Sequence, residues 1–150
     1  MTTFKRTNSD DADFQQLVVL LDEELAIRDG DEHTFYNQFN KIQNIANVIV
    51  CYVDDKAIAC GAFKKYDDAQ VEIKRMFTLP EYRGKSIGHK VLKELELWAA
   101  ELHYTTCVLE TGKKQPEAIR LYEKAGYKII ENYGQYAGVE NSVCMMKLIL

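Results

Sequence analysis

The segment that decides the fold spans residues 71–88 and reads VEIKRMFTLPEYRGKSIG. Its first half is rich in β-branched and aromatic residues, which predicts a strand that ends at Thr78. A basic turn follows, and an amphipathic helical pattern begins at Ser86, whose apolar face consists of Ile87, Val91, Leu95, Trp98 and Leu102. The free N–H groups at a helix start form an anion site, and Gly84 and Gly88 allow close approach to the backbone, so we expect a phosphate ligand.

Two common nucleotide-binding motifs do not fit this turn. A Walker A loop needs a glycine at position 79, where the chain has Leu79. A dinucleotide-binding fingerprint needs a glycine at position 86, where the chain has Ser86. The turn therefore predicts phosphate binding by a different kind of loop.

Outward from this segment, hydrophobic periodicity predicts a single mixed α/β domain over residues 1–150. A helix between two strands implies one parallel strand pair, because such a crossover returns the chain in the same direction. The short turns after positions 53 and 65 favour an antiparallel meander. The expected strands are Thr3–Arg6, Val48–Val53, Lys56–Lys65, Gln70–Thr78, Thr105–Glu110, Tyr127–Glu131 and Ser142–Leu150, and the expected helices are Asp11–Ile27, Glu32–Lys41, Ser86–His103 and Pro116–Ala125.

The composition argues against several classes of protein. A net charge of −4 does not suit a general nucleic-acid binder, which needs a basic face. No apolar run reaches the roughly 18 residues that span a bilayer, and the first residues lack the apolar core of a signal peptide, so we expect a cytoplasmic protein without membrane contacts. We expect reduced core thiols and no metal, because no C-x-x-C pair or histidine at metal-ligand spacing accompanies Cys51, Cys60, Cys107 and Cys144.

Residues 83–88 resemble the pyrophosphate loop of the GNAT family of N-acetyltransferases, which reads Arg or Gln, two variable residues, Gly, one variable residue, then Gly or Ala. Residues 76–85 resemble the family's fourth strand, and residues 118–127 (AIRLYEKAGY) resemble its fourth helix. The sequence departs from the family at Ser86, a glycine in relatives, and at Gln115, an asparagine in many. The resemblance implies a mostly antiparallel mixed sheet of about six to seven strands, with one splayed parallel pair and about four flanking helices.

The resemblance also implies an activity and a co-substrate. An acetyl group would move from acetyl-CoA to a primary amine of a small molecule or peptide, by direct attack through a tetrahedral intermediate. In relatives one N–H of the fourth strand polarises the thioester, and Met76 is the candidate here; such a donor is worth roughly 3 kcal/mol. The expected cofactor-binding residues are Met76, Phe77, Thr78, Arg83, Gly84, Lys85, Ser86, Ile87, Gly88, Gln115 and Tyr122.

Glu72 is the candidate general base, since it lies eleven residues before Arg83, where histone-acetylating relatives carry one. An amine arrives as an ammonium ion and must lose a proton before it attacks, and a nearby carboxylate can accept that proton. The alternative is a purely structural role, in which Glu72 is a strand carboxylate paired with Lys74 or Arg75. Glu110, at the end of the following strand, is a second candidate for the base.

Tyr122 is the candidate acid, because relatives place a tyrosine there beside the cofactor's sulfur. Periodicity alone favours a core role, since Tyr122 lies on the buried stripe of its helix. Basic side chains are candidates for phosphate contacts or for a solvated face: Arg83, Lys85, Lys113 and Lys114. The histidines at positions 33, 89 and 103 are expected to carry no chemistry.

The acceptor site, by resemblance, lies between the first two helices and the last two strands. Acidic residues there would suit a cationic amine, or are ordinary exposed carboxylates: Asp22, Glu23, Glu24, Asp29, Asp31 and Glu32. The loop 132–138 would line the entrance or simply close a hairpin. Strand edges near the C-terminus often pair into a homodimer in this family. The alternatives are a non-catalytic acyl-CoA sensor, a longer acyl donor and a hydroxyl acceptor.

Overall fold

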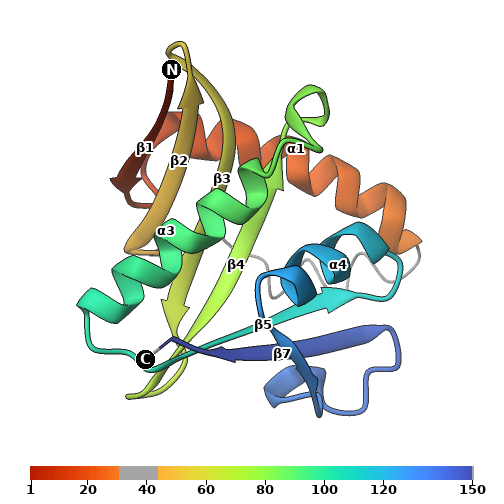
Figure 1. Cartoon of the computed structure of the whole chain (residues 1–150). Helices are drawn as coiled ribbons and strands as arrows, with labels where there is room; N and C mark the ends of the chain where they lie inside the picture. The colour runs from red at the N-terminus through yellow and green to blue at the C-terminus, as the bar shows by residue number, and fades with distance from the viewer. Residues whose placement is uncertain (31–43, 150) are drawn as a thin grey trace.

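The computed structural model describes residues 1–30 and 44–149 of the 150-residue chain. These residues form a seven-stranded sheet in the order β1-β2-β3-β4-β5-β7-β6, with three α-helices against it (Figure 1). Among these strands only the β4–β5 pair is parallel, as the sequence predicts. The strands are β1 (Thr2–Thr7), β2 (Asn47–Val53), β3 (Lys56–Lys65), β4 (Gln70–Thr78), β5 (Thr106–Gly112), β6 (Lys128–Ile130) and β7 (Ser142–Leu148); the helices are α1 (Ala12–Asp29), α3 (Ile87–Glu101) and α4 (Pro116–Lys124), with short 3-10 turns η2 (Pro80–Tyr82) and η3 (Gly134–Tyr136).

The predicted meander of β2, β3 and β4 is confirmed, and its turns are polar. Asp54 and Asp55 both have positive φ (49° and 69°), the geometry of a two-residue hairpin that Asp tolerates. Between β3 and β4, the Asp67 carboxylate accepts hydrogen bonds from the N–H groups of Ala69 (2.9 Å) and Gln70 (2.8 Å). These local turns set the strand pairing that leads into β4.

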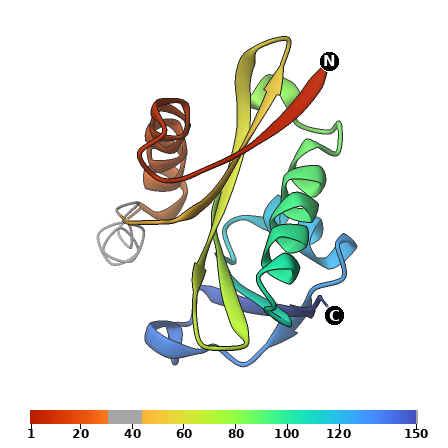
Figure 2. The ribbon, with the colours of Figure 1, turned by 90° about the vertical axis from the view of Figure 1, so that its left-hand side faces the viewer.

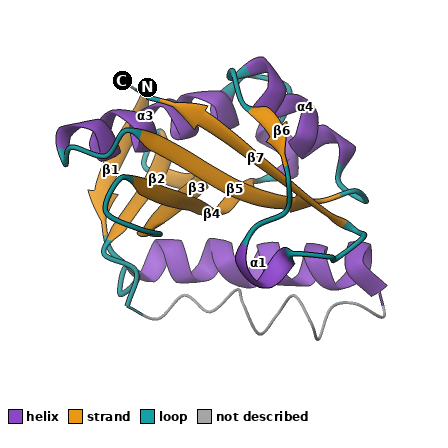
Figure 3. Ribbon diagram, turned by 90° about the horizontal axis from the view of Figure 1, so that it is seen from below, coloured by secondary structure: helices purple, strands orange, loops and turns teal. Residues whose placement is uncertain are grey.

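Helices cover both faces of the sheet. Figures 2 and 3 show α1 on one face and α3 with α4 on the other. The carboxylate of Asp11 caps α1 by accepting from the N–H of Phe14 at 3.0 Å. Each of these helices buries one stripe against the sheet: Phe14, Leu17, Val18 and Leu21 on α1, and Ile87, Val91, Leu92, Leu95 and Ala99 on α3.

The parallel strands diverge after a short paired stretch. Gln70–Ile73 pair with Thr106–Leu109, whereas β4 continues to Thr78 and β5 to Gly112. Figure 1 shows the two strands opening away from each other, with α4 beside the opening. Within the described chain, the backbone of β4 beyond Ile73 therefore has no strand partner on its β5 side.

A β-bulge in β4 changes the direction of the side chains in its second half. The β3–β4 register slips so that Gly61 alone lies opposite Arg75 and Met76, and Arg75 has a positive φ of 59°. Arg75 consequently pairs with Asp22 of α1 on one face, whereas Met76 packs into the core below α3 on the other. A Cβ at Gly61 would approach the Met76 sulfur to 2.5 Å and a methyl of Leu95 to 2.8 Å, so a larger residue there would force these side chains to shift.

The structure corrects one predicted core position. Leu102, predicted on the buried face of the helix that follows Ser86, is 47% exposed, because α3 ends at Glu101 and the helical period stops there. Glu96 is buried instead, and it accepts hydrogen bonds from the Tyr127 hydroxyl (2.9 Å) and the Lys147 ammonium (2.8 Å). The predicted helix Glu32–Lys41 lies outside the described residues.

The described residues also bear on membranes and metals. None of their helices combines the length and the apolar character needed to cross a membrane. Nor do three or more His, Cys, Asp or Glu side chains gather into a metal-binding group in that part of the chain. All four cysteines are buried and free, as the sequence predicts.

Candidate active site

The loop between β4 and α3 presents the backbone that the sequence predicts for phosphate binding. Gly84 and Ser86 both adopt left-handed φ, at 78° and 63°. Glycine is the residue that adopts this conformation without strain. This explains why the pyrophosphate-loop pattern described above has a glycine at the position of Ser86. The Ser86 side chain makes no capping bond to α3, so it satisfies none of the first N–H groups of the helix.

A pocket of about 650 Å³ lies beside this loop, between the second half of β4, the start of α3, and α4. The structure brings ten of the eleven predicted cofactor-binding residues to its wall: Met76, Phe77, Thr78, Arg83, Gly84, Ser86, Ile87, Gly88, Gln115 and Tyr122. Lys85 is not in the wall, and its ammonium lies 5.6 Å from the centre of the Tyr82 ring.

The side chain of Arg83 is bonded to two other residues of the chain. Its Nε donates to the carbonyl oxygen of Thr78 at 2.8 Å, and its Nη2 donates to Oε1 of Glu24 at 3.0 Å. A second ion pair, between Arg28 and Glu117 at 3.1 Å, lies on the same rim of the pocket. The last two turns of α1 are thus attached both to the loop and to α4.

A smaller pocket of about 110 Å³ lies against the diverging ends of β4 and β5. Its wall includes Glu72 and Glu110, the two predicted candidates for the base. The two pockets share five lining residues: Leu21, Met76, Gln115, Ala118 and Tyr122. Met76 and Tyr122 therefore stand where a long ligand in the large pocket would meet a second molecule in the small one.

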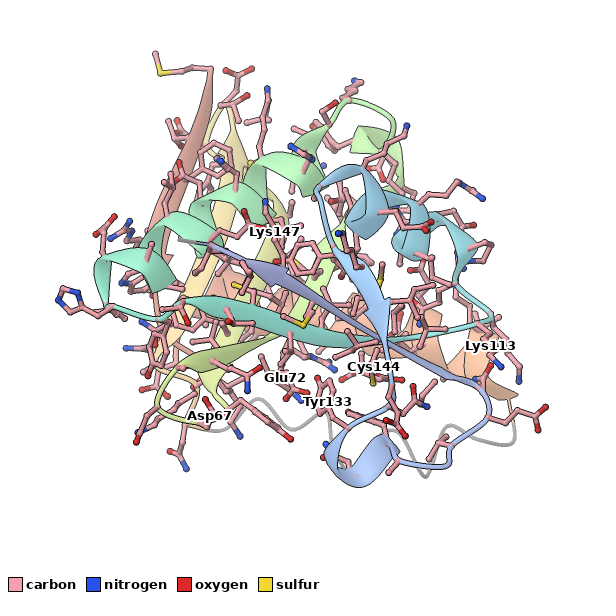
Figure 4. The ribbon with its side chains drawn as sticks, turned by 60° about the horizontal axis from the view of Figure 1, so that its bottom comes forward. Asp67, Glu72, Lys113, Tyr133, Cys144 and Lys147 are labelled. Carbon is pink, nitrogen blue, oxygen red and sulfur yellow. The ribbon has the colours of Figure 1, made fainter. Side chains whose placement is uncertain are left out.

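Glu72 is nearly buried, with 9% of its surface exposed, and it has two partners. The Tyr133 hydroxyl donates to Oε2 at 2.6 Å, and the Lys74 ammonium lies 3.6 Å from Oε1 (Figure 4). The predicted pairing with Lys74 is therefore present, whereas Arg75 pairs with Asp22 instead. Glu72 is thus an ion-paired strand carboxylate, as one interpretation predicts, and it also lines the small pocket; its role as the base stays a prediction.

Tyr122 is 7% exposed and belongs to the core on the α3 side of the sheet, while its surface also lines both pockets. Its ring lies edge-on to the ring of Tyr127, with centres 5.9 Å apart. Burial, and to a lesser degree the charge of Glu110, raises the pKa of Tyr122 above its ordinary value. The phenol therefore keeps its proton at neutral pH.

Several residues at the small pocket were not predicted as part of the site. Lys74 and Arg75 line it, as does Tyr136 from η3. For Tyr136, the only sequence signal was its position in the loop 132–138. Because Tyr136 lines the small pocket, the structure favours the interpretation that this loop borders the pocket. Lys113 and Lys114 line neither pocket, His89 lines the large one, and His33 lies outside the described residues.

Comparison with known proteins shows the family of this chain. The model of the acetyltransferase (GNAT) family matches residues 14–127. An IAA acetyltransferase from Azospirillum brasilense is 32% identical over 139 residues, 89% of this chain and 91% of the relative. A structure described as an acyl-CoA N-acyltransferase from Klebsiella pneumoniae aligns with a TM-score of 0.84 and 26% identity, over 100% of this chain and 99% of that one. A GNAT acetyltransferase from Elizabethkingia anophelis, solved with acetyl-CoA bound, aligns with a TM-score of 0.71 and 16% identity, over 98% and 97% of the two chains. This chain belongs to the acetyltransferase (GNAT) family.

Proposed function

We propose that this protein moves the acetyl group of acetyl-CoA to a primary amine of a small molecule or peptide. The observation that carries the proposal is the meeting of the two pockets at Met76 and Tyr122. A transferase that acts by direct attack must bring two substrates together at one point, and the opening between β4 and β5 offers that point. A protein that only bound the cofactor would need the large pocket alone.

The residues of the large pocket fit coenzyme A. An added Cβ at Gly84 would meet nothing within 4 Å, so the loop has open space on that side. The uncapped N–H groups at the start of α3 suit a diphosphate, and the stretch of β4 beyond Ile73 suits an extended pantetheine arm. The relative from Elizabethkingia anophelis was solved with acetyl-CoA bound, which supports the same occupant here.

The chain's own groups supply the proton transfers that the reaction needs. When bound, acetyl-CoA supplies the acyl group as a thioester. Glu72 accepts one proton from the acceptor ammonium, which frees the nitrogen lone pair to form the new N–C bond. The N–H of Met76 is assigned to the carbonyl oxygen, where negative charge develops. As the C–S bond breaks and its electron pair passes to sulfur, Tyr122 donates its proton there, and the second proton lost by the nitrogen restores the phenol.

Two further properties belong to the proposal. Four free, buried cysteines support a reducing compartment such as the cytoplasm. The edge strand β6 carries Ile129 with 62% of its surface exposed, which supports homodimer formation through this edge. Light scattering after size-exclusion chromatography gives the mass in solution directly, and a monomer at all concentrations would contradict the dimer.

The test of the activity is a panel of primary amines incubated with acetyl-CoA while free thiol is measured. Thiol release that depends on an amine, with the acetylated product identified by mass spectrometry, supports the enzyme. Calorimetry with coenzyme A measures binding independently of turnover. Tight binding without thiol release across the panel would instead indicate a sensor of acyl-CoA.

A further inference from the structure

Arg75 is a buried cation in the wall of the small pocket. Its side chain is 1% exposed, and one of its terminal nitrogens pairs with the Asp22 carboxylate of α1. Its Nε is buried and has no hydrogen-bond partner within the described chain. A buried charged donor is costly to leave without a hydrogen bond, so an unpartnered Nε–H in a pocket wall is evidence for a ligand that completes it.

The small pocket has both signs of charge. Lys74, with 8% of its side chain exposed, lies next to Arg75 in the wall, and the carboxylates of Glu72 and Glu110 line the same pocket. The bulge places Lys74 and Arg75 on the α1 side of the sheet in succession, although neighbours on a regular strand face opposite sides. A pocket with two cations and two carboxylates suits a ligand that is itself a zwitterion.

Two acidic residues of α1 are not free to bind a polycation. Asp22 is paired with Arg75, and Glu24 is paired with Arg83. The acidic character that the sequence shows in this helix is therefore partly neutralised by cations of β4 and of the phosphate loop. This observation disfavours a polyamine as the acceptor.

We propose that the acceptor is a small amino acid, and that the Nε–H of Arg75 binds its carboxylate. Lys74 adds a second positive charge beside that carboxylate, and the amine faces Glu72. The pocket volume of about 110 Å³ suits the amino-carboxylate group of a free amino acid rather than a length of peptide. The inference rests on the proposed function, because it identifies the substrate class of the same site.

The first test compares matched acceptors with the wild-type protein. Each of the twenty amino acids is assayed beside its carboxamide, and the best one beside its decarboxylated amine. Loss of one charge-assisted hydrogen bond corresponds to about a 10- to 100-fold change, so kcat/KM for the amino acid should exceed that for its carboxamide by about this factor. Equal kcat/KM values for amino acids, carboxamides and simple amines would overturn the inference and leave the acetyltransferase function intact.

The second test uses Arg75→Lys, with Asp22→Asn as the matched control. Arg75→Lys keeps a positive charge for Asp22 but removes the Nε–H. The ratio of kcat/KM for the amino acid to kcat/KM for its carboxamide should therefore fall toward one, mainly through a higher KM for the amino acid. Asp22→Asn disturbs the other end of the same ion pair and keeps the Nε–H, so the preference should remain. An unchanged preference in Arg75→Lys would overturn the role of Nε.

Two measurements separate the inference from the function beneath it. Thermal melting identifies a variant that fails to fold, and the wild-type preference then decides the inference by itself. Calorimetry with coenzyme A, together with the amine panel, tests the proposed function. If coenzyme A binds and no amine is acetylated, then the proposed function has failed, and with it the inference.

Discussion

The hydroxyl of Tyr133 donates a 2.6 Å hydrogen bond to Oε2 of Glu72, across 61 positions of the chain. Figure 4 shows the two side chains next to each other. Tyr133 precedes η3, whose Tyr136 lines the small pocket, and the rings of Tyr133 and Tyr136 meet edge-on with centres 6.0 Å apart. The loop before β7 thus orients the candidate base as well as bordering its pocket.

Replacing Tyr133 by Phe should lower kcat by about 10-fold, because a hydrogen bond to a charged group is worth roughly 1.5–3 kcal/mol and only part of it serves to orient Glu72. Affinity for coenzyme A should not change, since Tyr133 does not line the large pocket. Steady-state kinetics and calorimetry give the two values. Tyr66→Phe is the control, because Tyr66 contacts the Tyr133 ring edge-on at 5.1 Å. An equal loss in both variants would mean that the effect of Tyr133→Phe does not come from its hydrogen bond to Glu72.

Replacing Glu72 by Gln should lower kcat/KM by about 100-fold or more near neutral pH, since general-base catalysis typically contributes roughly 10²–10⁴. The defect should shrink as the pH approaches about 10, because the acceptor amine then loses its proton to solvent. A pH–rate profile of both proteins measures this. Glu110→Gln is the comparison, as Glu110 lines the same pocket. A larger loss in Glu110→Gln would transfer the role of base to Glu110.

Replacing Tyr122 by Phe should lower kcat by about 100-fold and leave coenzyme A binding nearly unchanged, because only the proton donor is removed. Burial raises the pKa of Tyr122, so the phenol stays protonated at pH values where an exposed tyrosine would lose its proton. At any pH up to about 10, wild-type activity should therefore not decrease through ionisation of Tyr122. Tyr127→Phe is a control that removes another buried hydroxyl, one bonded to Glu96. Wild-type turnover in Tyr122→Phe across pH would exclude the acid role.

Replacing Ser86 by Gly should preserve coenzyme A affinity, because the N–H groups of the loop keep their positions, and should raise the free energy of unfolding, because the left-handed φ of 63° costs a non-glycine residue about 1–2 kcal/mol. The greater flexibility of glycine in the unfolded chain offsets part of that gain. Ser86→Val should weaken binding by roughly 10-fold, since a β-branched residue is strongly disfavoured at positive φ. Calorimetry measures both affinities. If Ser86→Gly weakens binding instead, the serine hydroxyl itself contacts the cofactor.

The free energy of unfolding should fall at alkaline pH because of the buried thiols. Burial raises the pKa of Cys60 to about 12, so from about pH 9 to pH 12 the unfolded chain loses this proton while the folded chain keeps it. Stability then decreases with rising pH by about 1.4 kcal/mol per pH unit for each such group. Denaturant titrations between pH 7 and 11 measure the slope. Cys60→Ala should reduce it by one thiol's share, and an identical slope would contradict the assignment.

The elements of this fold follow largely from local sequence patterns. The sequence predicts a helix that begins at Asp11, and Asp11 is the residue that caps α1. Pro116 begins α4, and Gly126 follows its end with a φ of 100°. The place of the turn around Gly84 was predicted as well, because glycines and a helix start lie within a few residues of each other. Such signals depend on neighbours in the chain, and a sequence displays those directly.

Within the described residues, the sequence by itself determined the strands and helices, the parallel pair, and the turn before α3 with most residues of the large pocket. Only the tertiary structure decided that Glu72 meets Tyr133, that Arg75 pairs with Asp22 rather than Glu72, and that Glu96 is buried while Leu102 is exposed. The physical reason is that these contacts depend on a bulge, on the point where two strands separate and on a loop returning from far along the chain. They are set by the packing of whole elements, which no periodicity within one element encodes.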